Sequence, residues 1–169
     1  PCIIGGVTIP HDRGLFGHSD ADVLCHAIGD ALLGAAALGD IGWHFPDTDE
    51  QYRDISSIIL LERIVDVVQE AGYTVSNVDA TVVAQRPKLA PHIMAIRSEV
   101  GKAFGFSLDR VSVKAMTSEQ LGFTGRVECI VAHASDLILS IHNIKLSKKV
   151  MFSLVTFVCP LFHLPSCSD

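Results

Sequence analysis

Apolar residues recur at helical spacing in three segments of the chain, each bounded by residues that start or end helices. The first stripe predicts a helix over residues 20–38, closed by Gly39. Similar stripes predict a helix over residues 56–71, closed by Gly72, and another over residues 91–105, which starts with a proline. The pattern therefore predicts three helices separated by segments of another kind.

The segments between these helices favour strands. Residues 78–84 alternate between apolar and polar positions and predict a half-buried strand. Residues 111–116 and 127–139 carry further strand patterns, and residues 3–9 are apolar around a glycine pair, as in a hairpin arm. Helices that alternate with strands are typical of an α/β sandwich rather than a bundle or a barrel.

The composition changes after Ser140. Three lysines precede an apolar run at residues 151–164, which is shorter than the ~20 residues that a membrane-spanning helix needs. We therefore expect one domain over residues 1–140, an atypical tail of unknown structure over residues 141–169, and no membrane anchor. Deletion of residues 143–169 should leave the fold intact.

The overall composition excludes several classes of protein. The chain has 169 residues, of which 49% are hydrophobic and 19% charged, enough for one domain with a buried core. A net charge of −6 excludes a broad basic surface for nucleic acid or anionic lipid, so any phosphate must be bound by a local site. The five cysteines form no CxxC pair, which favours a reducing compartment. Because the chain starts at Pro1 rather than Met, we expect a fragment without a targeting peptide.

Two features of the first predicted helix could bind a ligand. His18 and Ser19 precede the helix start, where free backbone N–H groups favour an anion, although Ser19 could equally serve only as the helix cap. His26 lies one turn after Asp22 and one turn before Asp30. It could be a metal ligand oriented by carboxylates or a hydrogen-bonded structural residue.

Three further segments carry polar groups in predicted turns. Residues 40–49 hold carboxylates that could bind sugar-like hydroxyls or a metal-bound phosphate, or form an ordinary acidic turn. Residues 86–88 could recognise a base and its phosphate, or be a plain turn. Residues 116–119 follow a strand, where Glu119 could hold Mg²⁺ or Mn²⁺. The common phosphate-loop, dinucleotide and nucleophile-elbow motifs are missing from the sequence.

Three long stretches of the sequence can be read together. They are GLFGHSDADVLCHAIGDALLGAAALGDIGWHFPDTD, DATVVAQRPKLAPHI and VKAMTSEQLGFTGR. In this order they closely resemble the 2-C-methyl-D-erythritol 2,4-cyclodiphosphate synthase family of the non-mevalonate isoprenoid pathway, over residues 3–139. The resemblance implies a two-layer sandwich of a mixed β-sheet with helices on one face, as the subunit of a homotrimer whose sites form between subunits.

The resemblance also implies a phosphorus–oxygen lyase. In the family, the 2-phosphate of 4-diphosphocytidyl-2-C-methyl-D-erythritol 2-phosphate attacks the nearer diphosphate, closes a ring and expels CMP. Two divalent metals assist: His26 matches a zinc ligand, and Glu119 matches the ligand of Mg²⁺ or Mn²⁺. His18 and Thr117 match groups that stabilise the transition state.

The substrate contacts implied by the resemblance fall into four groups. Phosphate contacts match His18 and Ser19. The methylerythritol loop matches Asp40, Ile41, Gly42, Phe45, Pro46, Asp47, Thr48 and Asp49. The cytidine pocket matches Ala84, Gln85, Arg86, Pro87, Lys88, Leu89 and Ala90, completed by Met116, Thr117, Ser118 and Glu119. A central cavity that can hold an isoprenoid diphosphate matches Phe123 and Arg126.

The chain departs from the family in three places. The family's first strand carries an Asp-x-His pair that supplies two zinc ligands, and this chain begins after it. We therefore expect His26 to hold zinc poorly, so that an inactive fragment is one possible outcome. Met116 stands where threonine is common, and the tail after Ser140 has no counterpart.

Two alternatives to an active synthase stay open. One is a catalytically inactive trimeric module that binds a cytidine nucleotide or an isoprenoid diphosphate. The other is the end of a bifunctional chain with a cytidylyltransferase upstream. The expected compartment is the cytoplasm for a bacterial protein and the plastid stroma for an algal or plant protein.

Overall fold

The computed structural model describes residues 1–17, 19–141 and 150–163. In chain order its elements are β1 (Cys2–Ile4), β2 (Val7–Ile9), β3 (Arg13–Leu15), α1 (Val23–Ala35), α2 (Ile41–His44), η1 (Glu50–Tyr52), α3 (Ser57–Glu70), β4 (Tyr73–Val83), η2 (Ala90–His92), α4 (Ile93–Phe104), η3 (Leu108–Arg110), β5 (Val111–Met116), α5 (Gly122–Gly125), β6 (Cys129–Ser140) and β7 (Val150–His163). Within these residues, no helix has the length and apolar character needed to cross a membrane.

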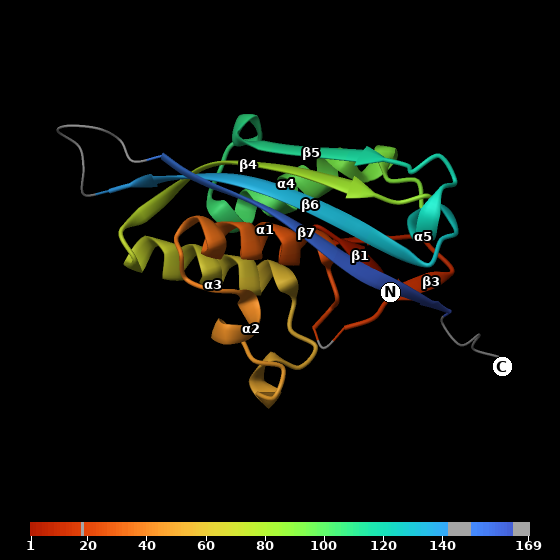
Figure 1. Cartoon of the computed structure of the whole chain (residues 1–169), viewed down its shortest axis with the longest axis horizontal. Coiled ribbons are helices and arrows are strands. Elements are labelled where there is room, and N and C mark those ends of the chain that lie inside the picture. Colours follow the sequence, from red (N-terminus) through yellow and green to blue (C-terminus); the bar gives the residue numbers. More distant parts are fainter. Residues whose placement is uncertain (18, 142–149, 164–169) are drawn as a thin grey trace.

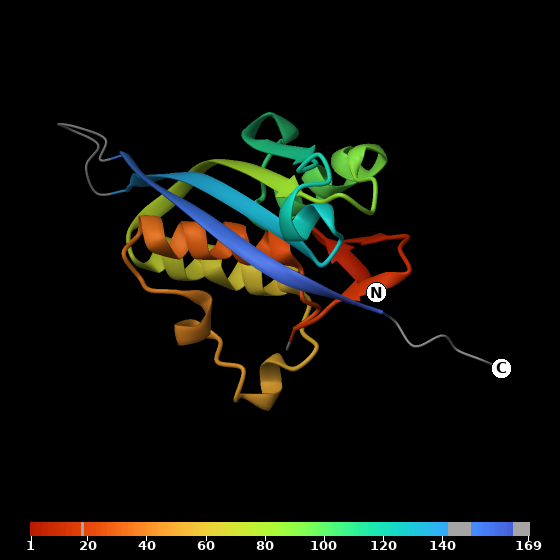
Figure 2. The ribbon, with the colours of Figure 1, turned by 45° about the vertical axis from the view of Figure 1, so that its right-hand side comes forward.

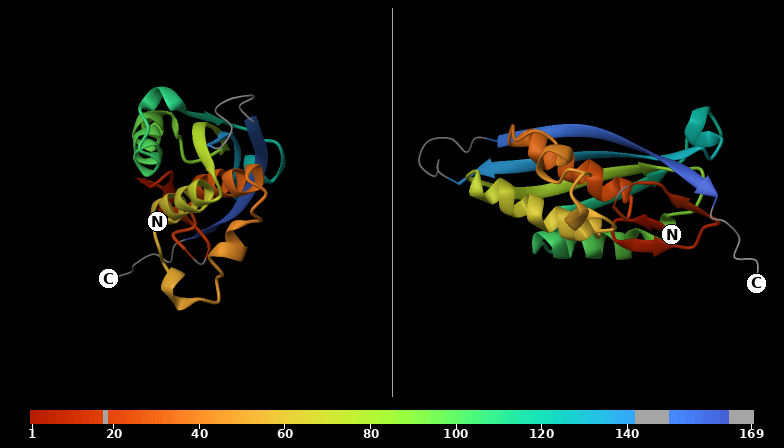
Figure 3. Two further views of the ribbon diagram at one scale, coloured as in Figure 1. Left: turned by 90° about the vertical axis from the view of Figure 1, so that its left-hand side faces the viewer. Right: turned by 90° about the horizontal axis from the view of Figure 1, so that it is seen from below.

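Five of the strands form one mixed sheet in the order β3-β7-β6-β4-β5 (Figure 1). β4 and β5 run parallel, whereas β6 is antiparallel to both β4 and β7. The helices α1, α3 and α4 form a second layer on one face of this sheet (Figure 3). The expected α/β fold with a mixed sheet and helices on one face is confirmed.

Helix α1 lies at the centre of the core. Its apolar side chains, among them Leu24, Ile28 and Leu32, are fully buried between the sheet and α3. Such complete burial is expected for a helix that is apolar on most of its circumference. Polar groups that remain on α1 therefore sit close to the core, and each needs a hydrogen-bond partner.

The first helix begins later than the sequence suggests. The N-cap of α1 is Asp22 rather than Ser19. The Asp22 carboxylate accepts hydrogen bonds from the backbone N–H groups of Leu24 and Cys25, both at 3.1 Å, and of Gly6 at 2.7 Å. Ser19 and Asp22 are both good caps. The bond from Gly6, which comes from a distant part of the chain, favours Asp22.

The segment expected as a strand or hairpin arm is a hairpin of β1 and β2. Gly5 and Gly6 connect the strands with φ values of +57° and +75°, which favour glycine. A Cβ atom at Gly5 would lie 2.5 Å from Cγ2 of Ile96 on α4. The glycine pair therefore allows both the turn and its close contact with the helix layer.

Part of the expected tail is an inner strand of the sheet. β7 pairs with β6 from Cys129↔Pro160 to Leu139↔Val150, and its last residues pair with β3. Figure 2 shows β7 running along α1, against which it packs. Residues 142–149 and 164–169 lie outside the described part, and the domain boundary at residue 140 stays a prediction.

Candidate active site

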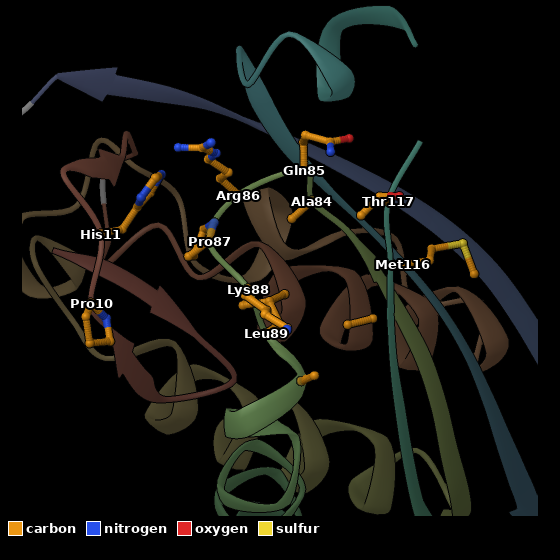
Figure 4. A pocket seen from close by; sticks show the side chains of 12 residues that line it. Pro10, His11, Ala84, Gln85, Arg86, Pro87, Lys88, Leu89, Met116 and Thr117 are labelled. Atoms are coloured by element: carbon orange, nitrogen blue, oxygen red, sulfur yellow. The ribbon is translucent and has the colours of Figure 1, made fainter. Parts of the chain in front are cut away.

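A pocket opens where the parallel strands β4 and β5 end (Figure 4). The backbone N–H of Ala84 donates to the carbonyl of Met116 at 3.0 Å and holds the two strand ends together as the chain turns away. The cavity measures about 620 Å³. Strand ends of this kind are where α/β proteins commonly bind small ligands.

Most residues predicted for the cytidine pocket line this cavity. They are Ala84, Gln85, Arg86, Pro87, Lys88, Leu89, Ala90, Met116 and Thr117. Ala84 and Leu89 are buried and anchor the turn, whereas Arg86 and Lys88 are exposed. Within the described residues, neither cation forms an ion pair with a carboxylate. Both charges are therefore available to an anionic ligand.

Three residues that the sequence did not indicate also line the pocket. They are Pro10, His11 and Ala115. His11 Nδ1 lies 2.9 Å from Asp12 Oδ1, and burial lowers the pKa of His11, which favours a neutral ring. Its Nε2 is buried and has no hydrogen-bond partner among the residues that the structure describes. Ala115 could have been found from its place at the end of a predicted strand, but no local pattern linked His11 to residues 84–90.

A more polar cavity of about 450 Å³ shares His11, Gln85 and Arg86 with the first. Arg13 and Arg126 add two further guanidinium groups to it. Arg126 pairs with Glu128 at 2.7 Å on the exposed surface. Phe123, the other residue predicted for a central cavity, does not line this cavity, and about half of its surface is exposed.

The turn after β5 holds a carboxylate in a defined position. Thr117 Oγ1 donates to Glu119 Oε1 at 2.9 Å and accepts from the Glu119 backbone N–H at 3.3 Å. Ser118 Oγ donates to the carbonyl of Leu121 at 2.8 Å, so it supports the turn rather than facing the pocket. One exposed carboxylate that can join phosphate oxygens is a usual environment for Mg²⁺. Glu119 therefore fits a bound Mg²⁺ or Mn²⁺.

The loop predicted to bind methylerythritol borders a different, smaller cavity of about 130 Å³. Its lining comprises Ser19, His26, Ile41, Phe45, Asp47, Tyr52 and Leu60. The other loop residues, Gly42, Pro46 and Thr48 among them, do not line it. Asp40 and Asp49 cap α2 and η1, where their carboxylates accept from the backbone N–H groups of Trp43 and Gln51. Within one chain, this loop and the cytidine pocket thus face separate cavities. His18 lies outside the described residues.

His26 is one of the residues that line this smaller cavity. Its Nε2 lies 3.3 Å from Ser19 Oγ, and its ring packs against Phe157 of β7 with 5.2 Å between ring centroids. Burial lowers the pKa of His26 more than the nearby charge of Asp20 raises it. The ring is therefore a neutral imidazole near pH 7.

The described residues around His26 do not fit a zinc ion. Asp22 caps α1, and Asp30 accepts from the backbone N–H of Ile41 at 2.8 Å, so both carboxylates that share its helix face are engaged. Asp20 accepts from the backbone N–H and the hydroxyl of Ser57. Across the described ranges, no group of three His, Cys, Asp or Glu side chains could hold a metal ion. A zinc site usually needs at least three protein ligands.

A family model described as the YgbB family matches residues 1–139. The chain belongs to the YgbB family. The match ends within β6, so β7 lies beyond the part of the chain that identifies the YgbB family.

Two similar proteins, both called 2-C-methyl-D-erythritol 2,4-cyclodiphosphate synthase, match this YgbB chain over most of their length. The protein of Salinibacter ruber is 59% identical over 140 residues, which cover 83% of this chain and 89% of that protein. The protein of Syntrophomonas wolfei is 60% identical over 136 residues, covering 80% and 87%.

Solved structures resemble the YgbB chain over nearly its whole length. A CDP-bound form of a 2C-methyl-D-erythritol-2,4-cyclodiphosphate synthase aligns with a TM-score of 0.66 and 29% identity, over 96% of this chain and 90% of that chain. The bifunctional IspDF from Campylobacter jejuni aligns with a TM-score of 0.71 and 37% identity. In that case the alignment covers 96% of this chain, which spans only 38% of the bifunctional one.

Proposed function

We propose that this protein is a 2-C-methyl-D-erythritol 2,4-cyclodiphosphate synthase, a lyase of isoprenoid biosynthesis. It would convert 4-diphosphocytidyl-2-C-methyl-D-erythritol 2-phosphate to the cyclic diphosphate and CMP. The observation that carries the proposal is the pocket at the ends of β4 and β5, which unites the residues expected to bind cytidine. Relatives with 59% and 60% identity bear this enzyme's name, and neither favours the alternative of an inactive binding module.

The pocket offers separate groups for the base and for the phosphates. The backbone of residues 84–90 presents N–H and C=O groups to the edge of a base, and the buried Leu89 supports that turn from below. Lys88 and Arg86 supply the charge that a diphosphate needs. A cytidine diphosphate therefore suits this pocket in shape and charge.

The reaction needs positioning more than a protein nucleophile. An oxygen of the 2-phosphate forms a bond to the nearer phosphorus of the diphosphate, and the bond from that phosphorus to the CMP oxygen breaks. Thr117 would turn its hydroxyl proton from Glu119 to a phosphate oxygen when the substrate binds, which would free the Glu119 carboxylate for a metal ion. A Mg²⁺ or Mn²⁺ bound at Glu119 would neutralise developing negative charge. Ser19, which lines the smaller cavity, would contact the 2-phosphate, and His18 retains its proposed transition-state role.

We also infer a homotrimer. Support comes from the separation of the sugar loop and the cytidine pocket within one chain, because a neighbouring subunit could bring the two together. The outward face of β7 carries Phe152 and Leu154, which are 74% and 70% exposed. Large exposed apolar side chains in one place are typical of contacts between subunits. The cationic cavity at Arg126 would bind an isoprenoid diphosphate near such a contact, with Phe123 against its apolar chain.

The test measures nucleotide binding and CMP release in parallel. Titration calorimetry should show that CDP binds more tightly than GDP, and chromatography should show CMP release from the substrate with Mg²⁺ and zinc present. Lys88→Ala should weaken CDP binding about tenfold, or ~1.4 kcal/mol, with little effect on cytidine, because only the phosphates contact the ammonium group. Lys102→Ala, an exposed lysine on α4, is the matched control. A folded chain that binds no cytidine nucleotide would overturn the proposal.

A further inference from the structure

Strand β7 supplies a part of the fold that the family-matched segment lacks. That segment ends at residue 139. Strand β6 pairs along its edge with β7, and helix α1 packs against β7. Without residues 150–163 the sheet would lose the strand that joins β3 to β6. The tail therefore fills a position that the rest of the chain leaves open.

The sequence of β7 fits this position in detail. Its residues alternate between faces, with Val155, Phe157 and Cys159 turned towards α1 and Leu154 and Val158 turned outwards. The fit at the far end is close, because a Cβ atom at Gly34 of α1 would lie 2.9 Å from Ser153 Oγ. Helix and strand approach closely here at a glycine, so a larger residue at position 34 would require the Ser153 hydroxyl to shift.

Phe157 is the β7 residue that meets His26. The two rings lie 5.2 Å apart between centroids at an interplanar angle of 36°. The Nε2 atom of His26 is hydrogen-bonded to Ser19. The inward neighbours of Phe157 on the strand, Val155 and Cys159, offer no carboxylate or imidazole, and Cys159 Sγ donates to the carbonyl of Phe16 at 3.3 Å. The strand side of His26 is therefore apolar.

We propose that β7 closes the His26 face of α1 with an aromatic contact, so that this chain binds its nucleotide without holding zinc at His26. This inference rests on the proposed function only in assigning the nucleotide to the pocket at β4 and β5. His26 is then a hydrogen-bonded structural residue, one of the two alternatives its position in the sequence allows. Among the described residues, the zinc expected from the family resemblance has no set of three ligands.

The first experiment measures metal content independently of activity. The full chain, freed of metal and then dialysed against Zn²⁺, should retain less than about 0.1 zinc per chain by mass spectrometry. A zinc-selective chelator, with Mg²⁺ in excess, should leave the CDP affinity unchanged. One zinc per chain that is lost in His26→Ala but kept in His44→Ala would overturn the inference and leave the proposed function standing. Loss of CDP binding in the parent chain would instead overturn the proposed function.

The second experiment creates the missing ligands. Val155→Asp with Phe157→His places a carboxylate and an imidazole on the inward face of β7, beside His26. This variant should bind one Co²⁺ per chain with the visible absorption of a tetrahedral site. Phe152→Asp with Leu154→His repeats the spacing on the outward face and should not. If the inward variant folds, as judged by circular dichroism, and binds no Co²⁺, the placement of β7 beside a potential metal position is wrong.

Discussion

Asp136 should destabilise this fold at neutral pH. It lies on β6 opposite Val78 of β4 and Ser153 of β7, with 1% of its surface exposed. Neither carboxylate oxygen has a hydrogen-bond partner in the described part of the molecule. Burial, and to a lesser extent the charge of Asp79, raises the pKa of Asp136 well above its usual range. Asp79 is itself paired with Lys114, so that lysine does not neutralise Asp136.

The sign of the effect follows from the two pKa values. The folded chain holds the Asp136 proton to a higher pH than the unfolded chain, whose carboxyl has a pKa of about 3.9. The contribution of Asp136 to the free energy of unfolding is therefore most favourable below that pH. It falls by ~1.4 kcal/mol per pH unit as the pH rises towards the pKa of the folded state. The unsatisfied polar group adds a cost of about 1–3 kcal/mol. Asp136→Val should stabilise the chain at pH 7 by at least this cost of about 1–3 kcal/mol, and the raised pKa adds to the effect as pH rises.

Urea unfolding at pH 5, 6 and 7 would measure this prediction. The advantage of Asp136→Val over the parent should grow with pH, and Asp136→Asn should remove the pH dependence while keeping part of the polar cost. Glu62→Gln, a change at an exposed position of α3, is the control and should do neither. A parent chain as stable as Asp136→Val at every pH would show that the carboxyl has a partner or is not buried.

Three further predictions concern the core. Asp22→Ala should cost about 2–4 kcal/mol in urea unfolding, because it removes the α1 cap and the bond from Gly6, whereas Asp49→Ala at an exposed cap should cost under about 1 kcal/mol. The described thiols are buried, and burial raises the pKa of Cys2 to about 11. A disulfide reagent should therefore modify them only after urea is added. They are Cys2, Cys25, Cys129 and Cys159. Contrary to the expectation from the sequence that residues 143–169 are dispensable, a chain that ends at residue 140 should be largely unfolded by circular dichroism, because β7 lies inside the sheet and buries several apolar side chains worth ~1.5–3 kcal/mol each. A chain that lacks only residues 164–169 should fold.

The sequence predicted the helices and central strands well because their signals are local. Apolar spacing and the closing glycines placed α3 and α4 within a few residues of their ends. The predicted start of α1 was wrong. Ser19 and Asp22 are both suitable N-cap residues by sequence, and only the hydrogen bond from Gly6, distant in the chain, favours Asp22. The strand at β7 was not predicted, since its apolar residues and Pro160 do not define one face until α1 lies against them.

The sequence likewise predicted only part of the candidate site. Residues 84–90 and Met116 meet because parallel strands bring their ends together, which a strand-by-strand pattern can anticipate. Pro10 and His11, which also line the pocket, follow the β1–β2 hairpin directly, so their position depends on how that hairpin packs. The metal role of His26 could not be judged from Asp22 and Asp30 at helical spacing. Both carboxylates are engaged by backbone N–H groups that a sequence pattern does not reveal.

The two faces of β7 connect the stability of the chain to its assembly. The inward face, through Phe157, packs on His26 and α1, while the outward face exposes Phe152 and Leu154 where we infer a subunit contact. A substitution on one face should therefore leave the other largely intact, because alternating side chains of a strand do not touch. Leu154→Ser should weaken association, measured by light scattering, without changing the contact at His26. Phe157→Ala should mainly lower the free energy of unfolding. Equal effects of both changes on both measurements would mean that folding and association of this chain are a single step.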